Sequence, residues 1–503
     1  MTPALGETTT PPQRLGFPET ELRGRTARGA VLNGVFMGGT QLLALAQGLI
    51  ATAILGPAGI GLYGVVSITA MSVVELKRIG VDEGFVQQTE ADQEAEFQKA
   101  FTVELMLAGI AAAVIALLAP IVAWAYGDWR LFALTLAVAY LPVAFALQAP
   151  GWVFFRRMDF LRVRTLQAIV PVVSFVVAVP LLVADVGVWS LVIGPFVASV
   201  VAVVVAIRMS PYPLAIRFDR EAVGRYARFS WPIFVSSAAL LAVQQGQLLA
   251  FDIEGGLEAV GFITLALLLT RYADRADQVV TTTIYPAICA IRDRVPTLED
   301  LFVKSGRLTL MWVGTFCAGL VLFAPDLVEF VVGDEWEPAV ILIQGLAVAA
   351  ALQQIGYSWF AFYRARGDSR PQAVESAVMV AAFAVLAVPA LFVWGAEEFA
   401  WARVVAVLPV LLVRGVYVRR LLPGVSLPLL ALRAAAPVLL GVAAALALRL
   451  SWDGAREGWQ AGAEIAVWVA ATAAATYALE RPLLRELRAS LRRGQPFVPR
   501  EAS

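Results

Sequence analysis

The sequence predicts an all-α polytopic membrane protein. We expect about 14 transmembrane helices, in two pseudo-symmetric six-helix lobes plus two C-terminal helices, around a central cavity. Two observations lead to this class. Of the 503 residues, 59% are hydrophobic and only 16% are charged, and the mean hydropathy is +0.75, which is far too apolar for a soluble chain of this length. The second observation is an internal repeat.

The repeat relates the first half of the chain to the second at an offset of 200 residues without a gap. Eight positions of the first copy recur identically in the second: Gly24, Arg25, Ala27, Arg28, Gln47, Leu49, Gly56 and Gly61 match Gly224, Arg225, Ala227, Arg228, Gln247, Leu249, Gly256 and Gly261. A weaker echo follows, in which Trp152, Phe155 and Arg157 match Trp359, Phe362 and Arg364. Repeats of this kind are typical of transporters built from two homologous halves.

The helices follow from apolar stretches of about 20 residues, the length that crosses a bilayer. We predict spans near residues 30–55, 60–82, 100–126, 131–153, 165–184, 187–207, 229–251, 258–290, 307–332, 338–363, 373–394, 398–418, 430–449 and 463–480. This gives a polar tail (1–29), an N-lobe of helices 1–6 (30–207), a linker (208–228), a C-lobe of helices 7–12 (229–418), helices 13 and 14 (419–480) and a basic tail (481–503).

The loops predict the orientation. Arginines concentrate in alternate loops, such as 156–164, 208–228 and 364–370, and in both tails, whereas the intervening loops hold only Arg130, Arg449 and Arg456. By the positive-inside rule both termini are cytoplasmic, and we expect a bacterial cytoplasmic membrane. The predicted external loops are only a few residues long, so they leave no room for an external catalytic domain.

Motifs for covalent chemistry are missing from the sequence. It has no histidine and only two cysteines, Cys289 and Cys317, and no Walker lysine or zinc spacing. The G-x-G-x-x-G pattern at 59–64 lies at the end of a membrane helix with no preceding strand, which argues against a dinucleotide site. We therefore expect a non-enzyme with no catalytic residue, no cofactor, no metal and no nucleic-acid partner.

Charged residues inside two predicted spans are the main candidates for a site. The segment 257–291 carries Arg271, Asp274 and Arg275, and the repeat places Glu75, Lys77, Arg78 and Asp82 at corresponding depth in the first half. An arginine at the centre of a span costs about 2.5–3.5 kcal/mol, so these faces are expected to meet water or a partner helix rather than lipid. They could form ion pairs between the halves, or a cationic site whose guanidinium groups bind phosphate.

Amides on the first helix of each half are the second set. Gln41 and Gln47, with Gln244 and Gln247 in the second half, lie on broad polar faces. Such groups could join neighbouring helices, at about 0.6 kcal/mol each, or line a cavity and bind sugar hydroxyls.

Two stretches and the two-lobed helix count resemble the polysaccharide biosynthesis branch (Wzx-like oligosaccharide flippases) of the multidrug/oligosaccharidyl-lipid/polysaccharide exporter superfamily. The stretch ATAILGPAGIGLY at 51–63 is similar to the family's LGP-x-x-x-G-x-Y/F turn, and FRRMDF at 155–160 is similar to its R-x-M-x-F linker. The chain departs from the lipid II flippases, because its first helix is uncharged from Asn33 to Gln47.

The resemblance implies a flippase that moves polyprenyl-pyrophosphate-linked oligosaccharide repeat units across the membrane by alternating access, for cell-surface or exopolysaccharide synthesis. The pyrophosphate would meet Arg78, Arg271 and Arg275, and the glycan would meet Gln41, Gln47, Gln244 and Gln247. Glu75, Asp82 or Asp274 would carry a coupling ion, H⁺ or Na⁺, or act in gating. Besides the lipid-linked oligosaccharide, the partners would be membrane lipids and other glycan-assembly proteins.

Two alternatives remain at this point. The same fold could serve as a multidrug-type antiporter of small cations. A membrane-embedded polysaccharide polymerase or ligase would belong to another class, and it typically needs a large external loop.

Overall fold

A computed structural model of the protein describes residues 19–77, 81–82, 85, 92–157, 159–221, 224, 243–273, 288, 291, 294–366, 370–452 and 456–493. Across these ranges the regular structure is helical and no strand occurs, which confirms the all-α class. Of the predicted site residues, Arg78, Asp274 and Arg275 lie outside the described residues.

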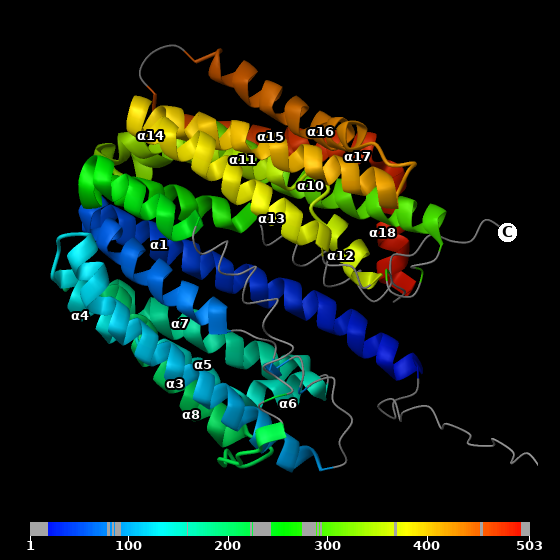
Figure 1. The fold of residues 1–503 in the computed structure, drawn as a ribbon. Helices are drawn as coiled ribbons and strands as arrows, with labels where there is room; N and C mark the ends of the chain where they lie inside the picture. Colours follow the sequence, from blue (N-terminus) through cyan, green and yellow to red (C-terminus); the bar gives the residue numbers. More distant parts are fainter. Residues whose placement is uncertain are drawn as a thin grey trace, which may run out of the picture.

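The helices follow one another along the chain (Figure 1). In the first half they are α1 (Glu19–Lys77), α3 (Gln93–Ala125), α4 (Arg130–Ala137), α5 (Leu141–Ala146), α6 (Pro150–Arg156), α7 (Phe160–Val183), the 3₁₀ helix η1 (Gly187–Trp189) and α8 (Ser190–Met209). Residues 243–273 are helical. Then come α10 (Val295–Leu327), the π-helix η2 (Val328–Val332), the 3₁₀ helix η3 (Asp334–Trp336), α11 (Glu337–Gln353), α12 (Trp359–Ala365), α13 (Arg370–Ala382), the π-helix η4 (Phe383–Ala387), α14 (Val388–Trp394), α15 (Ala396–Leu421), α16 (Leu427–Arg449), α17 (Gly458–Leu479) and α18 (Arg481–Arg493).

Twelve stretches of the described residues are long and apolar enough to span a membrane, so the protein is a multi-pass membrane protein. The predicted number of about 14 is not confirmed by this count. Two of the twelve, Gly38–Lys77 and Val243–Ala273, each cover two predicted spans. Each is interrupted by a glycine with positive φ, 66° at Gly56 and 67° at Gly256, a conformation that strongly favours glycine. The interruptions are 200 residues apart, as the repeat predicts.

The two ends of the bundle differ. One end holds the tight connections around Gly56, 184–189 and 333–336, and we call it the short-loop end. These connections lie close together, since Val188 is beside Gly59 and Glu335 is beside Gly56. At the opposite end, the long-loop end, lie the first residue of α1 and the last turns of α18 (Figure 1). The described termini are therefore on one side of the bundle.

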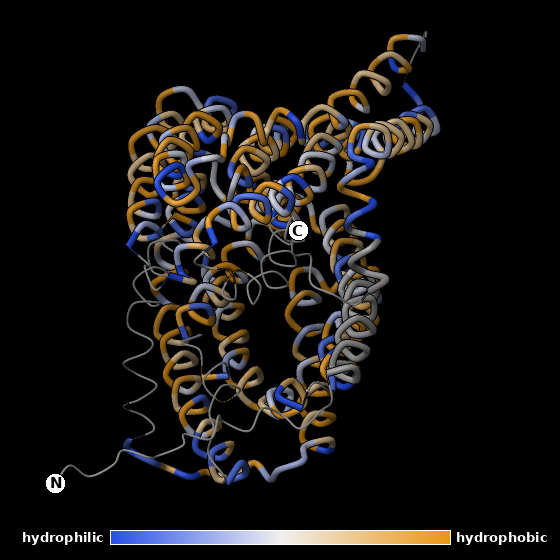
Figure 2. The backbone as a smooth tube through the Cα atoms, turned by 90° about the vertical axis from the view of Figure 1, so that its right-hand side faces the viewer, coloured by the Kyte–Doolittle hydropathy of each residue, from blue (hydrophilic) through white to orange (hydrophobic). Residues whose placement is uncertain are grey.

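The packing of the apolar core also differs between the two ends. At the short-loop end one core joins both halves of the chain, and it includes Leu62, Leu131, Ile263 and Leu342. Toward the long-loop end the described residues form three separate cores. Two of them, around Phe97 and around Phe154, contain residues of the first half alone, whereas the third, around Phe302 and Phe362, contains residues of the second half alone. The halves are thus fused at one end and separate at the other. Figure 2 shows the helices of both halves to be largely hydrophobic along their length.

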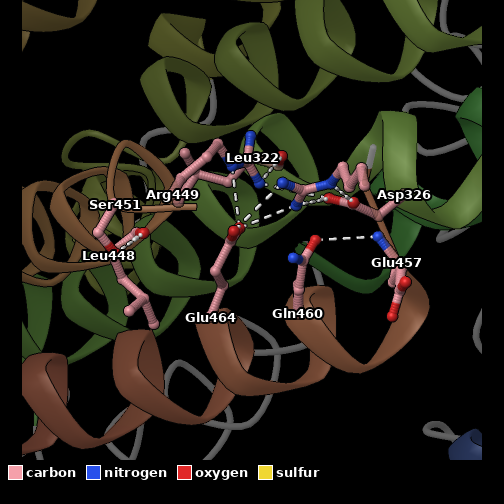
Figure 3. Close-up of polar contacts among 9 residues, drawn as sticks. Leu322, Asp326, Leu448, Arg449, Ser451, Glu457, Gln460 and Glu464 are labelled. Carbon is pink, nitrogen blue, oxygen red and sulfur yellow. Dashed lines mark hydrogen bonds and ion pairs between the residues drawn. The ribbon is translucent and has the colours of Figure 1, made fainter. Parts of the chain in front are cut away.

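The last two membrane helices, α16 and α17, are bound to α10 by charges near the short-loop end (Figure 3). Glu464 of α17 accepts a hydrogen bond of 2.9 Å from Nε of Arg449 and another of 2.8 Å from Nη2 of Arg456. Both arginines also pair with Asp326 of α10. Asp326 and Glu464 are buried, and buried carboxylates are stable only when they are paired in this way.

A second group of ion pairs joins α10 to the end of α17 and to α18, at the long-loop end. Arg307 of α10 pairs with Glu480, and Lys304 pairs with Glu486 of α18 at 2.7 Å. The α16–α17 hairpin is therefore held to the second half of the chain at both ends. The predicted boundaries of the lobes and of the linker remain predictions.

Candidate functional site

The two halves meet most closely through glycines of their second helices. A Cβ atom on Gly61 would overlap the carbonyl oxygen of Leu257, and a Cβ on Gly261 would overlap the carbonyl oxygen of Pro57. These two contacts exchange under the offset of 200 residues, so the helices cross about a local two-fold axis. Backbones approach this closely in membranes where one side has no side chain.

One turn further along the same helices the contact is still tight, because a Cβ on Gly64 would overlap the side chain of Thr264. Seven residues beyond that pair, on the same helix face, Met71 is 38% exposed and Arg271 is also exposed. Glu75, which follows Met71 on this face, is exposed as well. The rise between the packed and the exposed level is about 10 Å. The two helices therefore diverge toward the long-loop end, and the candidate site is the space between them.

A hydrogen-bonded contact between the halves accompanies this space. The amide Nε2 of Gln245 lies 3.5 Å from Oγ1 of Thr69 and 3.4 Å from Oγ of Ser72. Both hydroxyls belong to the part of α1 that follows Gly56. The sequence predicts a role for the neighbouring Gln244 instead. The polar spacing in 244–247 identified the segment, but it could not identify which amide faces the other half.

The four predicted glycan-binding amides have different environments. Gln41 and Gln244 are partly buried. Gln47 accepts a hydrogen bond from the hydroxyl of Ser174 on α7 at 3.2 Å, which is the helix-joining role that the sequence left open. Gln247 is only 2% exposed.

The predicted charged residues that the structure describes also differ in their exposure and in their partners. Arg271 is exposed, on the helix face that carries the contact of Thr264 with Gly64. Glu75 is exposed and Asp82 is partly buried. Lys77 is buried and pairs with Glu104 of α3, within its own half.

Two arginines of α15, one fully and one partly buried, were not among the predicted site residues. Arg414 is fully buried; it pairs with Glu375 at 2.7 Å and donates to the carbonyl oxygens of Gln353 and Ile355. Arg403 lies over the ring of Phe383, 5.3 Å from its centroid. The signal was available, because both are arginines within a predicted span, at 398–418, and such residues are expensive in a membrane unless they have a function or a partner.

Comparison with known proteins shows the family and the fold. Residues 50–341, more than half of the chain, match the family described as "Polysaccharide biosynthesis protein". The chain belongs to this family. The match includes both glycine contacts and the exposed Arg271. A search among curated proteins found no match for this family member.

Solved structures share its fold. A structure titled "Lipid II flippase MurJ, inward closed conformation" is similar with a TM-score of 0.70 at 11% identity, covering 90% of this chain and 100% of that one. An inward-facing multidrug resistance MATE family transporter of the MOP superfamily has a TM-score of 0.63 at 15% identity, with 77% and 96% covered. The multidrug transporter DinF-BH in complex with R6G has a TM-score of 0.56 at 16% identity, with 82% and 98% covered. The family member thus has the fold of flippases and multidrug exporters.

Proposed function

We propose that this protein is a flippase that moves polyprenyl-pyrophosphate-linked oligosaccharide repeat units across a bacterial cytoplasmic membrane by alternating access. The observation that carries the proposal is the divergence of the two second helices from the Gly61–Leu257 contact to the exposed Arg271. Alternating access needs two halves that separate at one end while they stay closed at the other.

The orientation of this opening follows from the loops. If both termini are cytoplasmic, as the arginine distribution predicts, the long-loop end faces the cytoplasm. The space beside Arg271 is then open to the inner leaflet, where a newly assembled lipid-linked glycan would enter. The glycan would occupy the space between the halves while the polyprenyl chain stays in the bilayer.

The pyrophosphate would bind to Arg271, together with Arg78 and Arg275, which lie outside the described residues. Guanidinium groups form paired hydrogen bonds with phosphate oxygens, and these bonds are strengthened by charge. Gln41 and Gln244, which are partly buried, are the stronger candidates for the sugar hydroxyls. Gln47 and Gln247 would instead hold the surrounding helices in place, since Gln47 is hydrogen-bonded to Ser174 and Gln247 is buried.

A second candidate function is export of small organic cations coupled to H⁺ or Na⁺. The exposed carboxylate of Glu75 on the same helix face favours it, because a carboxylate in a membrane cavity attracts cations. Asp82 and Asp274 would be further ion carriers. The fold supports this candidate equally, since the DinF-BH structure with R6G shares it.

The test is complementation in a strain whose own glycan flippase has been deleted. Arg271→Ala combined with Arg275→Ala should lower surface glycan about tenfold or more, because each charge-assisted hydrogen bond contributes about 1.5–3 kcal/mol. The amount of protein in the membrane should not change. Arg419→Ala, which removes an exposed arginine of α15, serves as the matched control and should retain export.

Two outcomes would contradict the flippase proposal. One is normal surface glycan from the double variant, which would remove the arginines from the pyrophosphate site. The other is a wild-type protein that restores no surface glycan but confers resistance to cationic drugs, which would establish the antiporter.

A further inference from the structure

Arg403, which is partly buried, differs from Arg414 and Arg449 in having no anionic partner among the described residues. It lies seven residues into α15, about 10 Å from the short-loop end, and its Nε atom is buried without a hydrogen-bond partner. Arg414, three turns further along the same helix, is paired with Glu375 and two carbonyl oxygens. Arg449 is paired with Asp326 and Glu464.

The contact of Arg403 with Phe383 does not replace a counter-anion. A cation over an aromatic ring is stabilised only modestly, whereas a charge that is withdrawn from water without an ionic partner loses much of its hydration. The pairing of Arg414 with Glu375 shows how the same helix provides a partner for another of its guanidinium groups. The buried Nε atom of Arg403, which has no hydrogen-bond partner, is therefore the feature that needs an explanation.

A cavity lies next to the guanidinium. Its lining comes from three helices: Gln353 of α11, Met379 of α13, and Arg403, Ala406, Val407 and Val410 of α15. It has room for a group of about the size of a water molecule. A halide ion is only a little larger, while a phosphate or a sugar is much too large.

The amide of Gln353 adds a second donor to the cavity. Its Nε2 points to the sulfur of Met379 at 3.6 Å, and a thioether is a weak acceptor. A stronger acceptor in the cavity would draw this N–H away from the sulfur. The described lining thus offers one cation and one neutral donor, and no carboxylate that would repel an anion.

The helix that covers the cavity is locally irregular. Phe383, the ring beneath Arg403, is the first residue of the π-helix η4, and π-turns within helices occur often at functional sites. One turn from the cavity toward the short-loop end, Phe399 packs edge-on against Phe251, with ring centroids 4.9 Å apart. The cavity therefore lies beside 243–255, the first helix of the second half.

We propose that this cavity binds a small monovalent anion, such as chloride, against the guanidinium of Arg403. The bound anion completes the packing of α11, α13 and α15 as an exchangeable counter-ion, in the way that Glu375 does permanently for Arg414. The lining residues all belong to the second half, and the proposal does not rest on the proposed function.

The test measures the melting temperature of the purified full chain while chloride replaces gluconate at constant sodium concentration and ionic strength. The wild-type protein should show a saturable rise, since a ligand that binds only the folded state stabilises it. Arg403→Met should show no rise, whatever its own starting stability. Arg419→Met, which removes an exposed arginine of the same helix, should keep the wild-type response.

A second variant covers the case in which Arg403→Met does not fold. Val407→Phe keeps the arginine but fills the cavity, and it should also abolish the response to chloride. Crystals soaked in bromide should show an anomalous peak in contact with the guanidinium of Arg403. An unchanged chloride response in both variants, no response in the wild type, or a bromide peak only elsewhere would each overturn the proposal.

Discussion

Adding one methyl group at the closest contact between the halves should shift the protein away from the conformation described above. In Gly61→Ala the new Cβ would overlap the backbone carbonyl of Leu257. A backbone atom cannot turn aside as the end of a flexible side chain can. The variant must therefore separate the two second helices at the short-loop end.

The magnitude follows from the contact. Forcing a methyl group into a tightly packed contact typically costs about 1–3 kcal/mol. The cost falls only on the state in which the halves touch at the short-loop end, because the contact is broken when they separate. A difference of about 1–3 kcal/mol changes the ratio of two states about 5- to 150-fold. Gly261→Ala meets the backbone of Pro57 and should act in the same direction. The double variant should show less than the sum, because both methyl groups disturb one interface.

The assay is a distance measurement between spin labels at Val186 and Glu398, exposed positions of the two halves near the short-loop end. Native Cys289 and Cys317 are first replaced. Gly61→Ala should increase the population with long distances. Gly109→Ala is the matched control, since nothing lies within 4 Å of the added methyl group. An unchanged distance distribution in both glycine variants would refute the closed short-loop end.

The remaining predictions concern buried ion pairs. Asp326→Asn should lower the melting temperature and destabilise the protein by about 1–3 kcal/mol. Arg449 and Arg456 lose a shared carboxylate in this variant, although both remain partly hydrated. An unchanged melting temperature would show that these ion pairs do not stabilise the protein. Arg414→Met should destabilise strongly by leaving Glu375 without its partner, whereas Arg414→Met with Glu375→Leu should recover much of the loss. Additive losses in that double-mutant cycle would count against the pairing.

The sequence was sufficient for the class, the family and the repeat because these depend on local signals. Apolar length predicts a membrane span from its own residues. The alignment of Gly56 with Gly256 predicted equivalent positions, and the structure gives both glycines the same positive φ. Even so, the repeat alone could not show that Gly61 and Gly261 contact the opposite half, since that contact depends on how the two halves dock.

The site was less predictable because a polar face does not reveal its partner. The sequence placed Gln47 and Arg271 in sets that either line a cavity or bind another helix. In the structure the first bonds Ser174, whereas the second is exposed between the halves. The assignments to substrate remain predictions. Arg403 and Arg414 are the opposite case, because the predicted site did not include them. Both stand out in an apolar helix, but only tertiary packing distinguishes the paired arginine from the one beside a cavity.

The charges at both ends of α16 and α17 determine which part of the molecule these helices accompany. They are fastened to α10 near the short-loop end through Asp326 and near the other end through Arg307 and Glu480. If the halves rock as proposed, the hairpin should move with the second half and slide relative to the first. A lipid chain lying along the hairpin would then move with that half. A fluorescent label on α17 would therefore report the movement of the second half together with α16 and α17.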